Sequence, residues 1–110
     1  MEEITFHVQG SAPDPYVVRF RKSGSNLTAL CTCPAGGVGQ CCKHRLRILE
    51  GNDEGIVSEN ARQVADVATW LAGTDVANAI EQLRHAEERF TAAKTEVSSL
   101  KKKLARALTD

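Results

Sequence analysis

Three short segments in the first third of the chain carry the residue pattern of β-strands. Residues 4–8, 16–21 and 27–31 alternate or cluster β-branched and aromatic side chains. A Gly-Ser-Ala-Pro-Asp-Pro sequence separates the first two segments, and residues 22–26 supply Gly24 and Asn26 between the second and the third. The pattern therefore predicts strands joined by tight turns.

Helical periodicity begins after the cysteine-containing segment. Residues 34–40 are glycine-rich and predict a loop, and residues 44–50 predict a short helix that ends at Gly51. A second helix is expected from an N-cap at Ser58 to about residue 72, because apolar residues recur there at spacings of three and four. Gly73 should end it, and either Thr74 or Asp75 should cap the helix that follows.

That last helix should extend to about residue 108 with an unbroken heptad repeat. Its large seam residues favour pairing between two chains, which predicts a homodimer without deciding between parallel and antiparallel helices. A monomer whose distal helix binds another protein is the alternative. The expected dimer interface consists of Val76, Leu83, Phe90, Val97 and Leu104.

A chain of 110 residues favours one ordinary domain with an appendage. We predict an α+β fold, with a small β-hairpin zinc-finger module at residues 1–55 followed at residues 56–110 by a helical hairpin with a long coiled-coil helix. The sequence has no long apolar run and does not begin like a signal peptide. We therefore expect no membrane association and a reducing intracellular location, cytoplasmic, nucleoid or nuclear.

Four cysteines lie between positions 31 and 42, and in a reducing compartment such a cluster favours a metal over disulfides. Cys31 and Cys33 form a Cys-x-Cys pair, and after eight residues Cys42 and His44 form a Cys-x-His pair. Three thiolates and an imidazole make a closed tetrahedral set for Zn²⁺. Cys41 also has a ligand spacing relative to His44 and is the alternative to Cys42.

This pattern resembles the SWIM zinc-finger family, in which Cys-x-Cys, a variable loop and Cys-x-His follow a pair of strands and lead into a helix. Pro34 and Lys43 are among its frequent neighbours. The resemblance covers roughly residues 15–50 and implies that Cys31, Cys33, Cys42 and His44 are the metal ligands. It also implies nucleic-acid or protein binding.

Charge suggests where a partner would bind, because residues 15–49 contain six basic residues and no acidic residue. We expect the arginines of the helix after His44 to face outward and the basic residues to contact nucleic-acid phosphates, with a protein adaptor or inhibitor as the alternative. Four protein ligands leave no position for a catalytic water, so we expect no enzyme activity. The predicted nucleic-acid contacts are Arg19, Arg21, Lys22, Lys43, Arg45 and Arg47.

Overall fold

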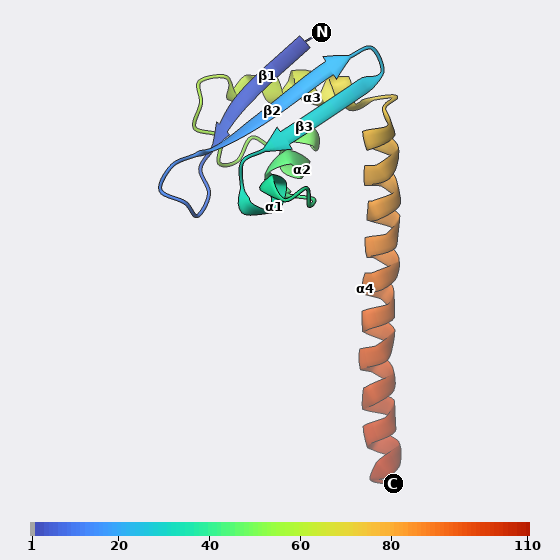
Figure 1. Ribbon diagram of the computed structural model, residues 1–110. Helices are drawn as coiled ribbons and strands as arrows, with labels where there is room; N and C mark the ends of the chain where they lie inside the picture. The colour runs from blue at the N-terminus through green and yellow to red at the C-terminus, as the bar shows by residue number, and fades with distance from the viewer. Residues whose placement is uncertain (1) are drawn as a thin grey trace. The chain divides into compact units, whose positions relative to one another are not determined.

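The first part of the chain forms a three-stranded antiparallel sheet in the order β1-β2-β3 (Figure 1). The computed structural model describes residues 2–110. The strands are β1 (Glu2–Val8), β2 (Tyr16–Ser23) and β3 (Asn26–Cys31), and Gly24 takes a positive φ of 60° in the tight turn that joins the last two. The predicted strands are thus confirmed, each with a residue or two more at one end.

One face of the sheet forms part of the hydrophobic core. Phe6, Val18 and Phe20 are completely buried, and the rings of Phe6 and Phe20 meet edge to face with centroids 6.0 Å apart. The alternate residues of β2, Arg19 and Arg21, therefore lie on the opposite face.

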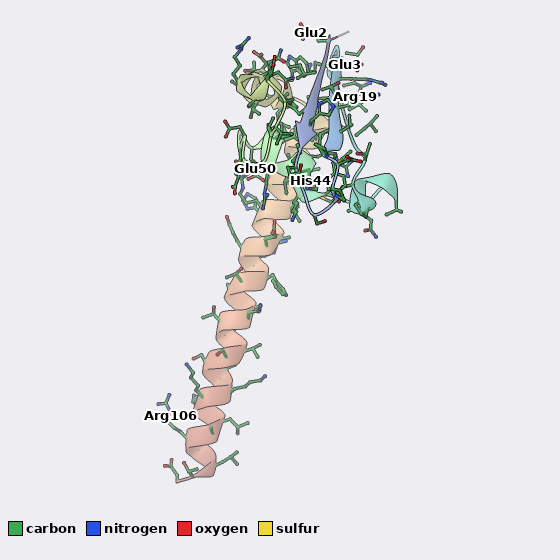
Figure 2. The ribbon with its side chains drawn as sticks, turned by 90° about the vertical axis from the view of Figure 1, so that its left-hand side faces the viewer. Glu2, Glu3, Arg19, His44, Glu50 and Arg106 are labelled. Carbon is green, nitrogen blue, oxygen red and sulfur yellow. The ribbon has the colours of Figure 1, made fainter. Side chains whose placement is uncertain are left out.

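Short helices cover this buried face. They are α2 (Lys43–Leu49), the 3-10 turn η1 (Ala61–Gln63) and α3 (Val64–Leu71), whereas the single turn α1 (Pro34–Gly37) follows the end of β3 and has no buried residue. Helix α2 packs on β3 and against α3, and both views place α2 and α3 on the same side of the sheet (Figures 1 and 2). Helix α2 contributes buried Ile48 and Leu49 to this layer, and α3, which contacts α2, contributes buried Val64 and Val67. The loop predicted at residues 34–40 thus contains one helical turn.

The segment before α3 is not helical but lies along the free edge of β1. The backbone N–H of Val57 donates to the carbonyl of His7 at 2.8 Å, and the backbone N–H of His7 donates to Ser58 Oγ at 3.1 Å. The prediction that Ser58 caps a helix was therefore wrong, since α3 begins only at Val64. Pairing with this segment occupies edge groups that would otherwise be open to another strand.

Helix α4 (Asp75–Leu108) has 34 residues and confirms the predicted long helix. Thr74 caps it, because its Oγ1 accepts a hydrogen bond from the backbone N–H of Ala77 at 3.2 Å. Fold class is thus mixed α+β. No helix among residues 2–110 is long and apolar enough to cross a membrane.

The chain divides into two compact units, the first reaching Ala77 and the second comprising Asn78–Asp110. Helix α3 belongs to the first unit together with the sheet. The boundary predicted at residue 55 was meant to separate a metal-binding module from a dimerisation arm. That division by function stays a prediction.

Candidate metal centre

The four predicted ligands come from three adjoining elements of the first unit. Cys31 is the last residue of β3, Cys33 is the N-cap of α1, Cys42 is the N-cap of α2, and His44 lies in the first turn of α2. All four side chains are buried (Figure 2 labels His44). The strand end and two helix starts thus direct three thiols and one imidazole to one point.

The distances within this cluster suit a small tetrahedral ion. All four ligand atoms lie within 4.8 Å of one another, and Cys31 Sγ lies 3.9 Å from His44 Nδ1. Ligands at metal–sulfur distances of about 2.3 Å around a tetrahedral ion would be roughly 3.8 Å apart. The cluster could therefore hold a metal ion with only a small contraction.

Backbone amides point at each of the three sulfur atoms. The N–H of Cys33 donates to Cys31 Sγ at 3.5 Å, that of Gly36 to Cys33 Sγ at 3.3 Å, and that of Arg45 to Cys42 Sγ at 3.5 Å. Such donors favour the charged thiolate, which is the form that binds metals. A Cβ at position 36 would lie 2.5 Å from the carbonyl oxygen of Cys31, so glycine permits the approach of this loop.

The imidazole of His44 is held by aromatic and backbone neighbours. Its ring centroid lies 5.1 Å from that of Tyr16, and a Cβ added to Gly10 would come within 3.4 Å of its Nε2. Nε2 thus faces Gly10, whereas Nδ1 faces the thiols, and Nδ1 is the nitrogen available to an ion. Neither Tyr16 nor Gly10 was singled out from the sequence, because both lie far from the cysteine motif along the chain.

Arg45 turns toward the cluster, so the expectation that it faces outward was wrong. Its Nε donates to Cys42 Sγ at 3.1 Å and its Nη1 donates to the carbonyl of Ala29 at 3.1 Å. Its Nη2 donates to the carbonyl of Gln40. Arg45 therefore links the ligand Cys42 to β3 and to the loop before α2, as a neighbour that orients a metal ligand would.

The pKa values of Cys31 and Cys42 shift in opposite directions. Burial raises the pKa of Cys31 to about 12. Burial also acts to raise the pKa of Cys42, but the backbone and side-chain hydrogen bonds and the charge of Arg45 outweigh it and lower that pKa. The pKa of His44 is lowered by burial and by the charges of Lys43 and Arg47, which favours the neutral, metal-binding imidazole.

The remaining cysteine and histidines lie outside the cluster. The structure places Cys42 among the four converging side chains, whereas Cys41 is exposed. His7 is exposed on β1, and His85 on α4 lies 3.1 Å from Glu81.

The six predicted nucleic-acid contacts are not brought together on one face. Arg19 and Arg21 approach Glu3 across the outer face of the sheet, at 3.7 and 3.0 Å (Figure 2 labels Arg19 and Glu3). Lys22 donates to the carbonyl of Gly24 in the adjacent turn. Arg45 faces the cluster, which leaves two exposed cations without a side-chain hydrogen bond or ion pair in the described part of the chain, Lys43 and Arg47 on α2.

The predicted dimer residues lie along α4. Val76 is half-buried in its first turn. The other four are exposed: Leu83, Phe90, Val97 and Leu104.

No protein-family model matches the sequence, and neither the curated proteins nor the solved structures contain a match. The buried cluster of three cysteines and one histidine is therefore the feature that points to a function.

Proposed function

We propose that this chain is a non-enzymatic, SWIM-type zinc-binding protein in which the ion has a structural role. The observation that carries the proposal is the convergence of four buried donors, Cys31, Cys33, Cys42 and His44, within 4.8 Å. Four protein ligands complete a tetrahedral site and leave no position for a substrate or a reactive water.

The donor set favours zinc over other abundant cations. Thiolate and imidazole ligands suit Zn²⁺, whereas Mg²⁺ and Ca²⁺ require oxygen donors. Amide hydrogen bonds to the three sulfurs, together with the guanidinium of Arg45 beside Cys42, offset the negative charge that three thiolates concentrate.

A structural ion fits the architecture because the four ligands come from three different elements. Cys31 anchors β3, Cys33 begins α1, and Cys42 and His44 begin α2. An ion at this point would tie the sheet to both helices and close the glycine-rich loop. Structural zinc contributes on the order of 10 kcal/mol to the folding of small modules.

Chelation tests this role. Removal of zinc under reducing conditions should abolish amide hydrogen-exchange protection in residues 15–50 and leave protection within the distal part of α4. Readdition of zinc should restore it. Unchanged protection of β2 and β3 in the chelated protein would contradict a structural role for the ion.

For the partner, we propose weak contact with nucleic-acid phosphates through Lys43 and Arg47. Both are exposed on α2 beside the cluster, and neither has an acidic partner among the described residues. Two phosphate contacts predict a log-log salt slope on duplex DNA of about −1.8. Lys43→Ala with Arg47→Ala should remove most of that slope, whereas Arg19→Ala should not, because Arg19 approaches Glu3.

A protein partner is the second candidate, favoured by exposed apolar side chains on the module. Leu30 is 48% exposed on the outer face of the sheet, and Val38 is 72% exposed in the loop after α1. Zinc-loaded protein that shifts neither DNA nor RNA at low salt would reject the nucleic-acid proposal and favour an adaptor. A pull-down that keeps its partner after nuclease treatment would support the adaptor directly.

A further inference from the structure

An apolar stripe runs along the distal part of α4 and is open to a partner. Phe90 is 65% exposed and Leu104 is 59% exposed, and Phe90, Ala93 and Val97 line a shallow hollow on the helix surface. Leu83, Val97 and Leu100 continue the same stripe. A row of large apolar side chains in water favours burial against another surface.

The two apolar positions of each heptad differ in side-chain size, and this difference constrains how two such helices can pack. The first position of each heptad is large, as in Leu83, Phe90 and Val97. The fourth position is alanine in every heptad but the one with Leu100. The residues at the first heptad position are Val76, Leu83, Phe90, Val97 and Leu104. Those at the fourth position are Ala79, Ala86, Ala93, Leu100 and Ala107.

Parallel helices would pair like with like. Phe90 would meet Phe90 of the second copy, and alanine would meet alanine in most of the alternate layers, which leaves those layers underfilled. Antiparallel helices pair the first heptad position with the fourth, so that a large residue meets a small one. Packing density therefore favours the antiparallel arrangement.

We propose that two copies of this chain associate through α4 as a full-length antiparallel coiled coil, in which Phe90 packs against Ala93 of the second copy and Leu83 against Leu100. This inference rests on the homodimer that the heptad repeat of α4 predicts. In the same register Val97 packs against Ala86, and Leu104 against Ala79, so the whole stripe is covered.

Flanking charges agree with this register. Glu87 falls beside Lys94 of the second copy and Arg89 falls beside Glu96, and two-fold symmetry doubles each attraction. In a parallel dimer Arg89 would fall beside Lys94 and Glu96 beside Lys101, so one repulsion would offset one attraction. Within residues 2–110 none of these four side chains forms an ion pair in its own chain, although the ammonium of Lys94 lies 5.4 Å from the centroid of the Phe90 ring.

The flanking charges also disfavour the neighbouring antiparallel registers. A shift of one heptad in one direction would place Glu96 against Glu96 and Arg89 against Lys103. The opposite shift would place Glu87 against Glu87 and Arg89 against Arg89. Like charges in these positions oppose association, so a single register satisfies both packing and charge.

Antiparallel pairing attaches the two metal modules at opposite ends of a rod. Helix α4 has 34 residues, which corresponds to about 50 Å at 1.5 Å per residue. Two weak phosphate-binding surfaces attached about this far apart along one rod would bind a long polyanion with avidity.

Sedimentation and a distance measurement test the proposal with full-length, zinc-loaded protein. A spin label at Thr109→Cys in a Cys41→Ser background should report a distance between copies of roughly 50 Å for the antiparallel dimer, whereas a parallel dimer brings the two labels side by side. A dimer with a short distance would overturn the antiparallel arrangement and leave dimerisation standing. A monomer at tens of micromolar would overturn both.

Charge reversal gives an independent readout. Arg89→Glu should weaken an antiparallel dimer roughly threefold to thirtyfold at low salt, because it places Glu against Glu96 twice. In a parallel dimer the same change would face Lys94 and strengthen association. Adding Glu96→Arg should restore the antiparallel dimer, and Arg106→Glu, which lies off the stripe, is the matched control (Figure 2 labels Arg106). Tighter association of Arg89→Glu would overturn the proposal.

Discussion

Replacing Arg45 with methionine should weaken zinc binding although Arg45 is not itself a ligand. The change keeps most of the aliphatic stem but removes the donors to Cys42 Sγ at 3.1 Å, to the carbonyl of Ala29 at 3.1 Å and to that of Gln40. Neighbours that orient a metal ligand typically contribute tenfold to a hundredfold in affinity. We therefore expect a loss of about 1.4 to 2.7 kcal/mol of zinc-binding free energy.

The pH dependence of this loss has a defined sign. Arg45 lowers the pKa of Cys42 against the effect of burial, so its removal raises that pKa. Zinc binds the thiolate, and at neutral pH the variant must release a more tightly held proton before it can bind the ion. The difference between variant and wild type should therefore be largest near neutral pH and shrink as the pH rises into the range where thiols ionise.

Competition with a chromophoric chelator measures both effects. Arg62→Met is the matched control, because Arg62 is exposed in η1 and donates no hydrogen bond to a thiol. Arg45→Lys keeps the charge and should fall between wild type and Arg45→Met. A zinc affinity for Arg45→Met within twofold of that for Arg62→Met would refute the role assigned to Arg45.

Three further results are expected. Phe20→Ala should lower the free energy of unfolding of the zinc-loaded protein by about 3 to 5 kcal/mol, since Phe20 is fully buried; a loss under 1 kcal/mol in a denaturant titration would contradict its place in the core. Thr74→Ala should lower helix stability by about 1 kcal/mol, because Thr74 accepts from the N–H of Ala77; unchanged hydrogen exchange at the start of α4 would argue against the cap. Zinc affinity should rise with pH, because the Cys31 pKa of about 12 leaves that thiol protonated until zinc displaces its proton; calorimetry in buffers of different ionisation enthalpy should detect proton release, and its absence would contradict thiol ligation.

Local signals in the sequence were sufficient for most of the elements. Alternation of side chains located the strands, Gly24 marked the turn between β2 and β3, and a cap at Thr74 or Asp75 followed by apolar heptads marked α4. The Cys-x-Cys and Cys-x-His spacing named the four residues that converge. These features depend on neighbours a few residues away, which is why one sequence is enough to find them.

Long-range pairings could not be predicted in this way. Ser58 has the composition of an N-cap, but its hydroxyl accepts from the N–H of His7, 51 residues earlier. Counting charges by segment treated Arg19 and Arg21 as free, whereas strand register brings Glu3 from β1 beside both. The partners of Ser58, Arg19 and Arg21 come near only in the folded chain.

The prediction for Arg45 failed for a different reason, because its partner Cys42 is close to it along the chain. Helical periodicity alone placed it outward, and the signal that could have corrected it is its position three residues after Cys42, where a long cation can return to the N-cap side chain. A guanidinium forms a strong, charge-assisted hydrogen bond with a thiol when the thiol is ionised.

Metal content of two neighbouring cysteine variants tests the central claim most directly. Protein purified under reducing conditions should contain about one zinc per chain, and the conserved-volume change Cys41→Ser should leave that content unchanged because Cys41 is exposed and outside the cluster. Cys42→Ser should reduce it sharply, since Cys42 is one of the four converging donors. Absence of zinc from the wild-type protein, or its loss only in Cys41→Ser, would contradict the account.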